Sequence, residues 1–575
     1  MTLRICLVTP FAWSQPHEVN EHVAGIAREL RKLGHTVTVL APSSRAGDLL
    51  AGRRALNRSE AADVIAVGPS VPVSRRSSLG VPVGVRANLT LALSQGDYDV
   101  VHGFEPGLPS ISYLALRDAQ TLAVATFFSP ERLTYPPRKA VREKLLGRID
   151  ALLAVSDETA AAAAERFPGD YRVLSAGVDL QLFRPIAKRN LIVVEFHTAS
   201  LPVARAALRS LRELPDWEII LLRTKPLSAR PAIPLGLRER VHVRSGRLPT
   251  SRAELFGQAA IFAPAPTGSP RLLLEAAASE SAVANASGLF EQPELMAAAI
   301  ARLANDEPLR CRRAAAARSQ ARDFADVARE LDELYRGLGV RRRTPRREQN
   351  PLADRPWVVA DLHMHTSWSH DCSIEVEELL DHAEAEGLGA IAVTDHNAFG
   401  GALEAARAAR GRDLIVIPGE EVKTSGQGEV IGLFLQKEIP RGLSFADTIA
   451  AIREQGGLVY LPHPFDRMHA IADPVTLHRH LAEVDVFEVY NARLLFETYN
   501  DEALRFARKY NLVAGAGSDA HVLQGVGTGA LRMRAFDGPE EFMISLRSAE
   551  VLRRPKSLAL LQSLKWVAQV KEKVR

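Results

Sequence analysis

The chain has 575 residues, of which 46% are hydrophobic and 24% are charged, a composition typical of a globular protein with two or three domains. Its formal net charge is only +4, and much of the basic excess falls in the short stretch 341–347, so nucleic-acid binding is not expected. The three cysteines are far apart in sequence, which argues against a disulfide framework and favours a reducing compartment.

We therefore expect a cytoplasmic protein. The first residues lead directly into a strand-like pattern, and no run of about eighteen uncharged apolar residues is present, so neither secretion nor a transmembrane segment is expected.

The first half of the chain alternates strand-like and helix-like segments. Residues 4–9 are apolar, Val23, Ile26 and Leu30 mark one face of a helix, and residues 36–40 alternate as a strand. Strand-like segments recur at 100–102, 122–126 and 151–155, and a second series follows at 191–194, 218–222 and 260–263. This α/β pattern predicts two Rossmann-like lobes, at residues 1–186 and 187–338.

Five segments of these lobes carry a recognisable pattern: the helix and glycine at 19–35, the stretches 101–106 and 125–127, the run 177–185 and the stretch 272–276. In this order they resemble nucleotide-sugar glycosyltransferases of the GT-B, family 4 type, and among them phosphatidylinositol-mannosyltransferase-like members. The resemblance spans about residues 3–338 and supports the prediction of two Rossmann-like lobes.

The functional positions of that family are altered in this chain. Phe128 stands where the family has a histidine, His17 and Glu18 replace paired glycines, and residues 195–202 lack the basic pair that holds the donor diphosphate. We therefore expect an inactive transferase module that retains at most a nucleotide-sugar pocket around Glu275, Thr267 and Gly268. A working transferase, with His17, His22 or His197 standing in, is the alternative.

An Arg- and Pro-rich segment at 339–355 interrupts the periodicity and predicts a linker, with a separate unit at 356–575. The last stretch, 557–575, alternates apolar residues with lysines and predicts an amphipathic helix packed on that unit.

Metal-capable side chains follow five apolar strands of this last unit. The segments 357–362, 390–394, 414–417, 458–461 and 513–516 end in His363 and His365, Asp395 and His396, Glu420 and Glu421, His463, and Asp519 and His521. One histidine alone is more often a hydrogen-bonded structural residue, but five strand ends predict one site at the carboxyl end of a β/α barrel. Imidazoles mixed with carboxylates suit zinc, manganese or iron.

The motifs DLHMHT, TDHN, PGEEV, HPFD and GSDAH, in this order, resemble the polymerase and histidinol phosphatase (PHP) domain over about residues 357–555. The resemblance implies a distorted seven-stranded β/α barrel and phosphoesterase chemistry on two or three divalent ions. It also implies the ligand sets: His363, His365, Glu421 and Asp519 for one ion; Glu421 and His463 for a second; Asp371, His396 and His521 for a third.

Three details stay open at this stage. Glu420 is the alternative to Glu421, and His370 is the alternative to Asp371. Many family members carry a histidine between the glutamate and the His-Pro motif, where this chain has residues 428–430 (Gly-Glu-Val), so the number of ions is not settled.

Asp395, Arg467 and Arg493 are the candidate catalytic residues, and the two arginines follow barrel strands from which they could contact a phosphate. The expected activity is metal-dependent hydrolysis of a phosphoester in a small phosphorylated metabolite or nucleotide. The alternatives are an active glycosyltransferase fused to a phosphatase, and a non-catalytic protein stabilised by metal.

Overall fold

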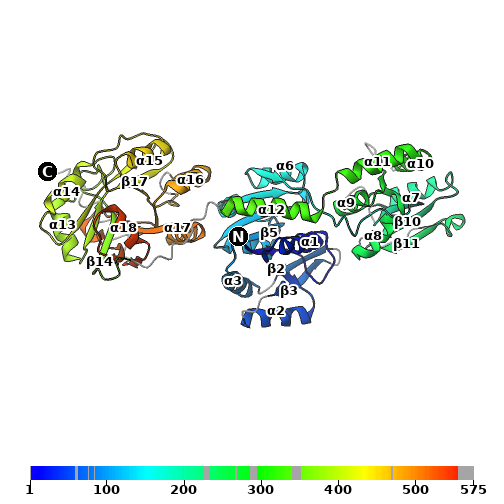
Figure 1. Ribbon diagram of the computed structural model, residues 1–575, viewed down its shortest axis with the longest axis horizontal. Coiled ribbons are helices and arrows are strands. Elements are labelled where there is room, and N and C mark those ends of the chain that lie inside the picture. The colour runs from blue at the N-terminus through cyan, green and yellow to red at the C-terminus, as the bar shows by residue number, and fades with distance from the viewer. Residues whose placement is uncertain are drawn as a thin grey trace. The chain divides into compact units, whose positions relative to one another are not determined.

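The computed structural model contains two compact units, residues 1–337 and 338–575 (Figure 1). It describes residues 2–58, 62–74, 77–82, 85–197, 200–223, 232–265, 269–284, 294–339, 351–467 and 471–554. Most of the predicted linker and the predicted helix at 557–575 lie outside the described residues, as do Thr267 and Gly268.

The first lobe of unit 1 is built on an eight-stranded sheet of order β4-β3-β2-β1-β5-β6-β7-β8, in which only the β3–β4 pair is antiparallel among the described strands. Its strands are β1 (Arg4–Val8), β2 (Thr36–Ser43), β3 (Val64–Ser74), β4 (Ser77–Pro82), β5 (Val100–Phe104), β6 (Leu122–Phe127), β7 (Ala151–Ala154) and β8 (Tyr171–Val173). Its helices are α1 (Glu18–Lys32), α2 (Ala46–Arg58), α3 (Arg86–Gln95), α4 (Ile111–Asp118), α5 (Lys139–Leu146) and α6 (Asp157–Arg166).

The second lobe of unit 1 carries a parallel five-stranded sheet of order β11-β10-β9-β12-β13. Its strands are β9 (Arg189–Phe196), β10 (Glu218–Arg223), β11 (Val241–Ser245), β12 (Ala259–Ala263) and β13 (Ala282–Val283). Its helices are α7 (Leu201–Ser210), α8 (Pro249–Gln258), α9 (Pro270–Ala278), α10 (Glu294–Asn305) and α11 (Glu307–Ser319). Parallel strands buried on both faces explain the continuous apolar runs in the sequence, and the prediction of two Rossmann-like lobes is confirmed.

The last helix of unit 1, α12 (Phe324–Gly339), returns to the first lobe. The hydroxyl of Tyr335 lies 2.6 Å from Nδ1 of His102 in β5, and Asp332 lies 2.9 Å from Nε2 of His35. Gly25 of α1 faces the ring of Phe324 so closely that a Cβ there would lie 2.5 Å from the ring. A glycine at this position therefore lets the two helices pack.

Unit 2 is a β/α barrel with helices outside a strongly curved sheet (Figure 1). Its strands are β14 (Trp357–Met364), β15 (Ala390–Val393), β16 (Ile415–Lys423), β17 (Glu429–Leu433), β18 (Leu458–Leu461), β19 (Val486–Asn491), β20 (Val513–Gly517), β21 (Gly529–Arg534) and β22 (Glu550–Arg553). Its helices are α13 (Val376–Ala385), α14 (Gly400–Ala408), α15 (Phe445–Glu454), α16 (Pro474–His480), α17 (Glu497–Tyr510) and α18 (Gly538–Leu546).

Seven of these strands, β14 to β20, form the predicted barrel. The amino half of β14 pairs with β21, but its carboxyl half meets the chain that follows β20. There the amide of Asp519 donates to the carbonyl of His363 at 2.7 Å, and the amide of His365 donates to the carbonyl of Ala520 at 3.1 Å. The barrel is therefore nearly closed at its carboxyl end, and the prediction of a PHP-like barrel is confirmed, with β21 and β22 as additional antiparallel strands.

Candidate metal centre

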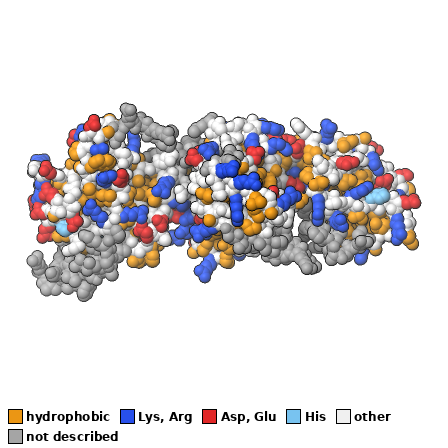
Figure 2. All heavy atoms as spheres, turned by 90° about the horizontal axis from the view of Figure 1, so that it is seen from below, with side chains coloured by type: hydrophobic (Ala, Val, Ile, Leu, Met, Phe, Trp, Pro, Cys, Tyr) orange, Lys and Arg blue, Asp and Glu red, His pale blue; other side chains and the backbone are white. Residues whose placement is uncertain are grey.

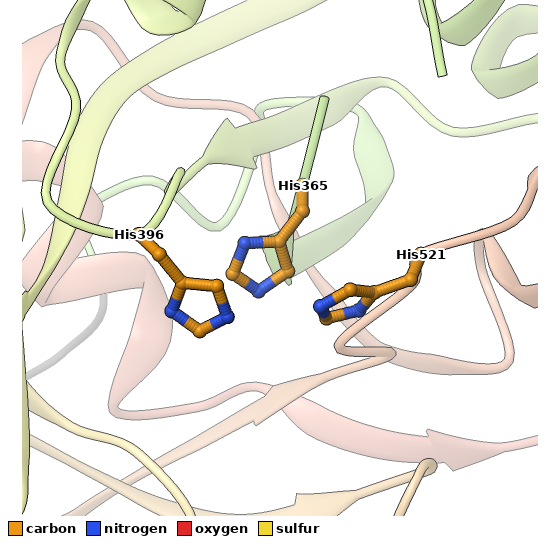
Figure 3. Close-up of side chains that lie close together, drawn as sticks. All are labelled: His365, His396 and His521. Atoms are coloured by element: carbon orange, nitrogen blue, oxygen red, sulfur yellow. The ribbon is translucent and has the colours of Figure 1, made fainter. Parts of the chain in front are cut away.

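The eight predicted metal ligands lie together at the carboxyl end of the barrel. We call this set the His–carboxylate cluster: His363, His365, Asp371, His396, Glu421, His463, Asp519 and His521. Figure 3 shows the rings of His365, His396 and His521 converging from three different segments. Ligand-type atoms of these three residues lie within 4.8 Å of one another.

Glu421 is the hub of the cluster. Its Oε1 lies 3.1 Å from Nε2 of His463, and its Oε2 lies 3.0 Å from Nδ1 of His396 and 3.3 Å from Nε2 of His363. A carboxylate that faces imidazoles through both oxygens is placed to bridge two cations.

Neighbouring Glu420 points to the opposite face of β16, because successive side chains of a strand alternate. It accepts a hydrogen bond from the amide of Ile439 at 2.8 Å, and burial raises its pKa to about 7. Of the two alternatives, the strand therefore directs Glu421 into the cluster.

Asp371 is likewise nearer the cluster than its neighbour His370. Its Oδ2 lies 3.1 Å from Nε2 of His521, and its Oδ1 lies 3.8 Å from Nε2 of His396. His370 is exposed, although its ring lies near that of His396 in a tilted arrangement, with centroids 5.5 Å apart.

Two neighbouring carboxylates orient the imidazoles of His363 and His365, one directly and one through a serine. Glu488 of β19 lies 3.1 Å from Nδ1 of His363. The hydroxyl of Ser369 lies 3.2 Å from Nδ1 of His365 and donates to Asp395 at 2.8 Å. Both contacts leave Nε2 of the histidine facing the cluster, which is how metal-binding imidazoles are held.

Asp395 is fully engaged by the loop after β14. Besides Ser369, it accepts hydrogen bonds from the amide and the hydroxyl of Thr366 at 2.7 and 2.6 Å. This arrangement positions the loop and is not aimed at the middle of the cluster.

The pKa values of the imidazoles in the cluster are shifted as expected for side chains that surround a cation site. Burial opposes the charged form of His363, but Glu421, Asp519 and Glu488 outweigh it and hold the pKa of this imidazole well above its usual value. Burial and the neighbouring His521 and His396 hold the pKa of His365 well below its usual value. In the protein alone, protons on some imidazoles thus compensate the carboxylates, and a divalent cation would replace them.

An unsatisfied buried atom supports the fit of a metal. Nε2 of His365 is buried and has no hydrogen-bond partner among the described residues, although Asp519 Oδ1 and Glu421 Oε2 lie 3.4 and 3.6 Å away. Buried polar atoms without partners are costly, and a cation at this position would satisfy the nitrogen and both carboxylates.

The backbone is unusual at two of these positions. His463 has a φ of 26° and Asp519 has a φ of 52°, in the left-handed region that favours glycine. Each lies two residues beyond the end of a barrel strand, so the strained turn aims its side chain back over the barrel end.

The two candidate arginines differ in position. Nη1 of Arg493 donates to Asp519 at 3.0 Å and lies 3.4 Å from Nε2 of His521, so this guanidinium borders the cluster. Arg467 is exposed on the segment after His463.

The sequence reasoning did not select three residues that the fold brings to the centre. Glu488 and Ser369 act through histidine hydrogen bonds, and Glu429 begins β17 with its carboxylate 3.7 Å from Nε2 of His463. The only sequence signal for Glu429 was its place between the motifs, where many PHP proteins have a histidine.

In unit 1, Glu275 lies in a buried ionic group that we call the Arg–Glu cluster: Glu21, Arg252, Arg271 and Glu275. Arg252 binds Glu275 through two hydrogen bonds of 2.7 Å and Glu21 through one of 2.6 Å. Arg271 adds a hydrogen bond of 2.9 Å to Glu275.

The remaining altered positions of unit 1 are also in apolar or self-satisfied surroundings. Phe128 packs edge-on against His22, with ring centroids 5.0 Å apart, and burial lowers the pKa of His22 to about 3. His17 caps α1 by accepting from the amide of Val19 at 3.2 Å, and burial, with Arg132 nearby, lowers its pKa to about 3.

Family models match parts of both units. The PHP domain family matches residues 361–500, a PHP-associated family matches residues 497–551, and Glycosyltransferase Family 4 matches residues 19–182. The chain is 34% identical to an uncharacterised protein of Methanocaldococcus jannaschii over 214 residues, 35% of this chain and 85% of that protein.

The chain is also 31% identical over 244 residues to the phosphatidyl-myo-inositol mannosyltransferase of Propionibacterium freudenreichii subsp. shermanii, covering 38% of this chain and 61% of that enzyme. Among solved structures, the sucrose-phosphate synthase of Thermosynechococcus elongatus has a TM-score of 0.43 at 15% identity, over 58% of this chain and 99% of that one.

Among the described helices, none has the length and apolarity needed to cross a bilayer. On the face shown in Figure 2, basic and acidic side chains are interspersed.

Proposed function

The chain belongs to the PHP family through its C-terminal unit, and on this premise we propose that this unit hydrolyses a phosphoester of a small phosphorylated metabolite or nucleotide. The observation that carries the proposal is the convergence of eight ligand-type side chains at one barrel end, around Nε2 of His365, which is buried and has no hydrogen-bond partner within the described ranges. Zinc, manganese or iron fits this mixture of imidazoles and carboxylates, with two or three ions per unit.

Divalent ions bound there would supply Lewis acidity toward the phosphoryl oxygens and a water of lowered pKa. The protein's own part is to hold the ligands. Glu488 fixes His363 and the Asp395–Ser369 pair fixes His365, so each presents Nε2. We therefore give Asp395 a positioning role in place of the catalytic role expected from sequence.

Arg493 is the proposed phosphate contact. Its guanidinium is bound to Asp519 at 3.0 Å, so it is held at the border of the cluster with further donors on the same planar group. Arg467, exposed after His463, remains a second predicted phosphate contact.

The test is turnover of the full chain on a panel of phosphomonoesters and phosphodiesters, after removal of metal with a chelator and reloading with manganese or zinc. Turnover that disappears with the metal and returns on reloading is the expected result. Metal binding without turnover on any panel member would instead favour the non-catalytic alternative.

We further propose that unit 1 is inactive as a transferase and acts as a binding or scaffolding module. Glu195, in the segment that lacks the family's basic pair, is buried and accepts hydrogen bonds from the amides of Ala265 at 3.2 Å and Ser269 at 3.3 Å. Ser269 precedes α9, and the amides at a helix N-terminus are those that usually bind a phosphate. In this chain a carboxylate of the protein already accepts from them.

The Arg–Glu cluster supports the same reading. Both arginines that contact Glu275 form ion pairs with carboxylates of the protein. A donor diphosphate could bind these arginines only by displacing those ion pairs. The Glycosyltransferase Family 4 match favours the second candidate, an active transferase. The chain spans 61% of the mannosyltransferase named above, and that enzyme's activity is carried over here only as this alternative.

A panel of nucleotide sugars distinguishes the two candidates. Calorimetric titration of the full chain is expected to show no binding of a nucleotide sugar, and radiolabelled donors are expected to give no transfer. Transfer from any donor, lost in Glu275→Gln, would establish the active alternative.

The predicted boundaries at 186/187, 338/339 and 355/356 are part of the proposal, as is a reducing, cytoplasmic location. None of the three cysteines, Cys6, Cys311 and Cys372, forms a disulfide, as expected in such a compartment.

A further inference from the structure

The β16–β17 hairpin places a second glutamate beside Glu421. The two strands are antiparallel, with Glu421 opposite Ile431 and Lys423 opposite Glu429. Residues directly opposite each other share one face of a sheet, and so do residues two apart on one strand. Glu429 and Glu421 are therefore diagonal neighbours on the face that carries the cluster.

The distances agree with this register. Oε2 of Glu429 lies 3.7 Å from Nε2 of His463, while Oε1 of Glu421 lies 3.1 Å from the same nitrogen. Ligand-type atoms of Glu429, Glu421 and His396 all lie within 4.8 Å of one another. Two ligands of one tetrahedral ion, with bonds of about 2.1 Å, are separated by about 3.4 Å, so these spacings suit a shared cation.

We infer that Glu429 is a metal ligand of this chain, which completes the site of the ion otherwise held by Glu421 and His463 alone. The inference rests on the proposed function, in which the cluster holds divalent ions. Two protein ligands are fewer than the three that catalytic sites ordinarily supply. Glu429 provides the third, and with 15% of its side chain exposed it leaves one side open for substrate or water.

The identity of this ligand sets the preference of the site for one metal over another. With Glu429 the ion has two carboxylates and one imidazole, a set rich in hard oxygen donors that suits manganese or magnesium. A histidine at this position would shift the same site towards zinc, for which imidazole is a good ligand.

The experiment compares the full chain with Glu429→Gln, Glu429→His and the exposed control Glu454→Gln. Each protein is stripped with a chelator and reloaded with Mn²⁺ alone or Zn²⁺ alone. Bound ions per chain are counted by mass spectrometry of the metal, and affinities are measured by calorimetric titration. Thermal unfolding of the stripped proteins reports whether each variant is folded.

Glu429→Gln is expected to bind one ion fewer, or to bind that ion at least about tenfold more weakly, while the other ions are retained. Glu429→His is expected to restore the ion with Zn²⁺ and to change the Zn²⁺-to-Mn²⁺ affinity ratio by at least about tenfold. Glu454→Gln is expected to match the unaltered chain.

Unchanged ion number and affinity in a folded Glu429→Gln would overturn the inference, because Glu429 would then be only an ion-pair partner of His463. That result leaves the phosphoesterase proposal intact if the unaltered chain still turns over. Conversely, Glu429→Gln could lose one ion while the unaltered chain shows no phosphatase turnover. That result would support Glu429 as a ligand and contradict the proposed phosphoesterase activity.

Discussion

The two clusters of ionisable side chains in this protein differ in their balance of acidic and basic groups. In the Arg–Glu cluster, two arginines face two glutamates at hydrogen-bonding distance, and the carboxylate of nearby Glu195 accepts backbone amides. In the His–carboxylate cluster, Glu421, Asp519 and Asp371 face imidazoles, and Arg493 is the one arginine that the described residues place in contact with them.

We call the Arg–Glu cluster closed, because its charged groups pair with one another, and the His–carboxylate cluster open, because its carboxylates outnumber the fixed cations. Buried charges are stable when paired and hydrogen-bonded, so the Arg–Glu cluster needs nothing from outside the chain. The His–carboxylate cluster has more acceptors than fixed cations, and Nε2 of His365 has no hydrogen-bond partner among the described residues, so bound cations would complete it. Burial and charge alone would have marked both as functional sites; pairing distinguishes them.

The strongest way to break this comparison is to remove ligands from the open cluster. His363→Ala and Asp519→Ala are expected to lower phosphatase turnover by more than about 100-fold and to lose bound metal, because each contacts the shared centre. Turnover and ion content are measured together on the full chain. His242→Ala, an exposed histidine of unit 1, is the control, and full activity in both cluster variants would remove the barrel end as the site.

Removing a side chain from the Arg–Glu cluster should instead lower the free energy of unfolding of unit 1. Arg252→Ala leaves the buried Glu275 and the partly buried Glu21 with one fewer cation, and it is expected to destabilise unit 1 by about 3–5 kcal/mol. Chemical or thermal unfolding of the full chain measures this, with phosphatase turnover unchanged. The exposed pair Arg189–Glu218 supplies the matched control, since Arg189→Ala should cost about 1 kcal/mol or less.

Much of this outcome could be predicted from sequence. Strand ends carrying His, Asp and Glu in five ordered motifs predicted the barrel and its carboxyl-end cluster, because strand direction alone brings such residues together. The two Rossmann-like lobes followed from alternating apolar runs and amphipathic helices.

What could not be predicted depends on pairing between distant segments. Glu429 reaches the cluster through the antiparallel register of β16 and β17, and the Arg252–Glu275 pair joins residues of α8 and α9 through their packing. The sequence showed only that residues 195–202 lack a basic pair. The amides of Ala265 and Ser269 donate to the Glu195 carboxylate from about 70 residues further along the chain, so spacing in the sequence could not reveal these hydrogen bonds.

A pH titration sharpens the comparison by testing unit 1 without metal. Burial lowers the pKa of His17, His22 and His102 to about 3, so between about pH 6.5 and 3 the unfolded chain binds more protons than the folded one. Stability is therefore lost as the pH falls, by up to about 1.4 kcal/mol per pH unit for each histidine.

Glu105 acts in the opposite direction. Burial raises the pKa of Glu105 to about 7. Its contribution to the stability of unit 1 is therefore present at low pH and is lost as the pH rises from about 4.5 to 7. Three histidines outweigh one glutamate, and the unfolding midpoint of unit 1 is expected to fall between about pH 7 and pH 5. A midpoint that stays flat or rises over this range would contradict the neutral, buried state of these imidazoles.

The smallest effect is expected at Glu420. Its carboxylate is directed away from the cluster, so Glu420→Gln should leave ion content and turnover within about twofold of the unaltered chain, because it removes no contact to the centre. Glu421→Gln beside it should lose metal. Equal losses in both variants would show that the strand does not discriminate between the two glutamates.

The left-handed backbone at His463 and Asp519 bears on how this protein can change by mutation. Glycine relieves the conformational cost at such φ values, so selection for folded yield alone would accept glycine at both positions. Selection for turnover would reject it, because the ligand is lost with the side chain. At these two positions the abundance and the activity of variants should therefore be anticorrelated, as expected where a protein gives up stability to retain a site.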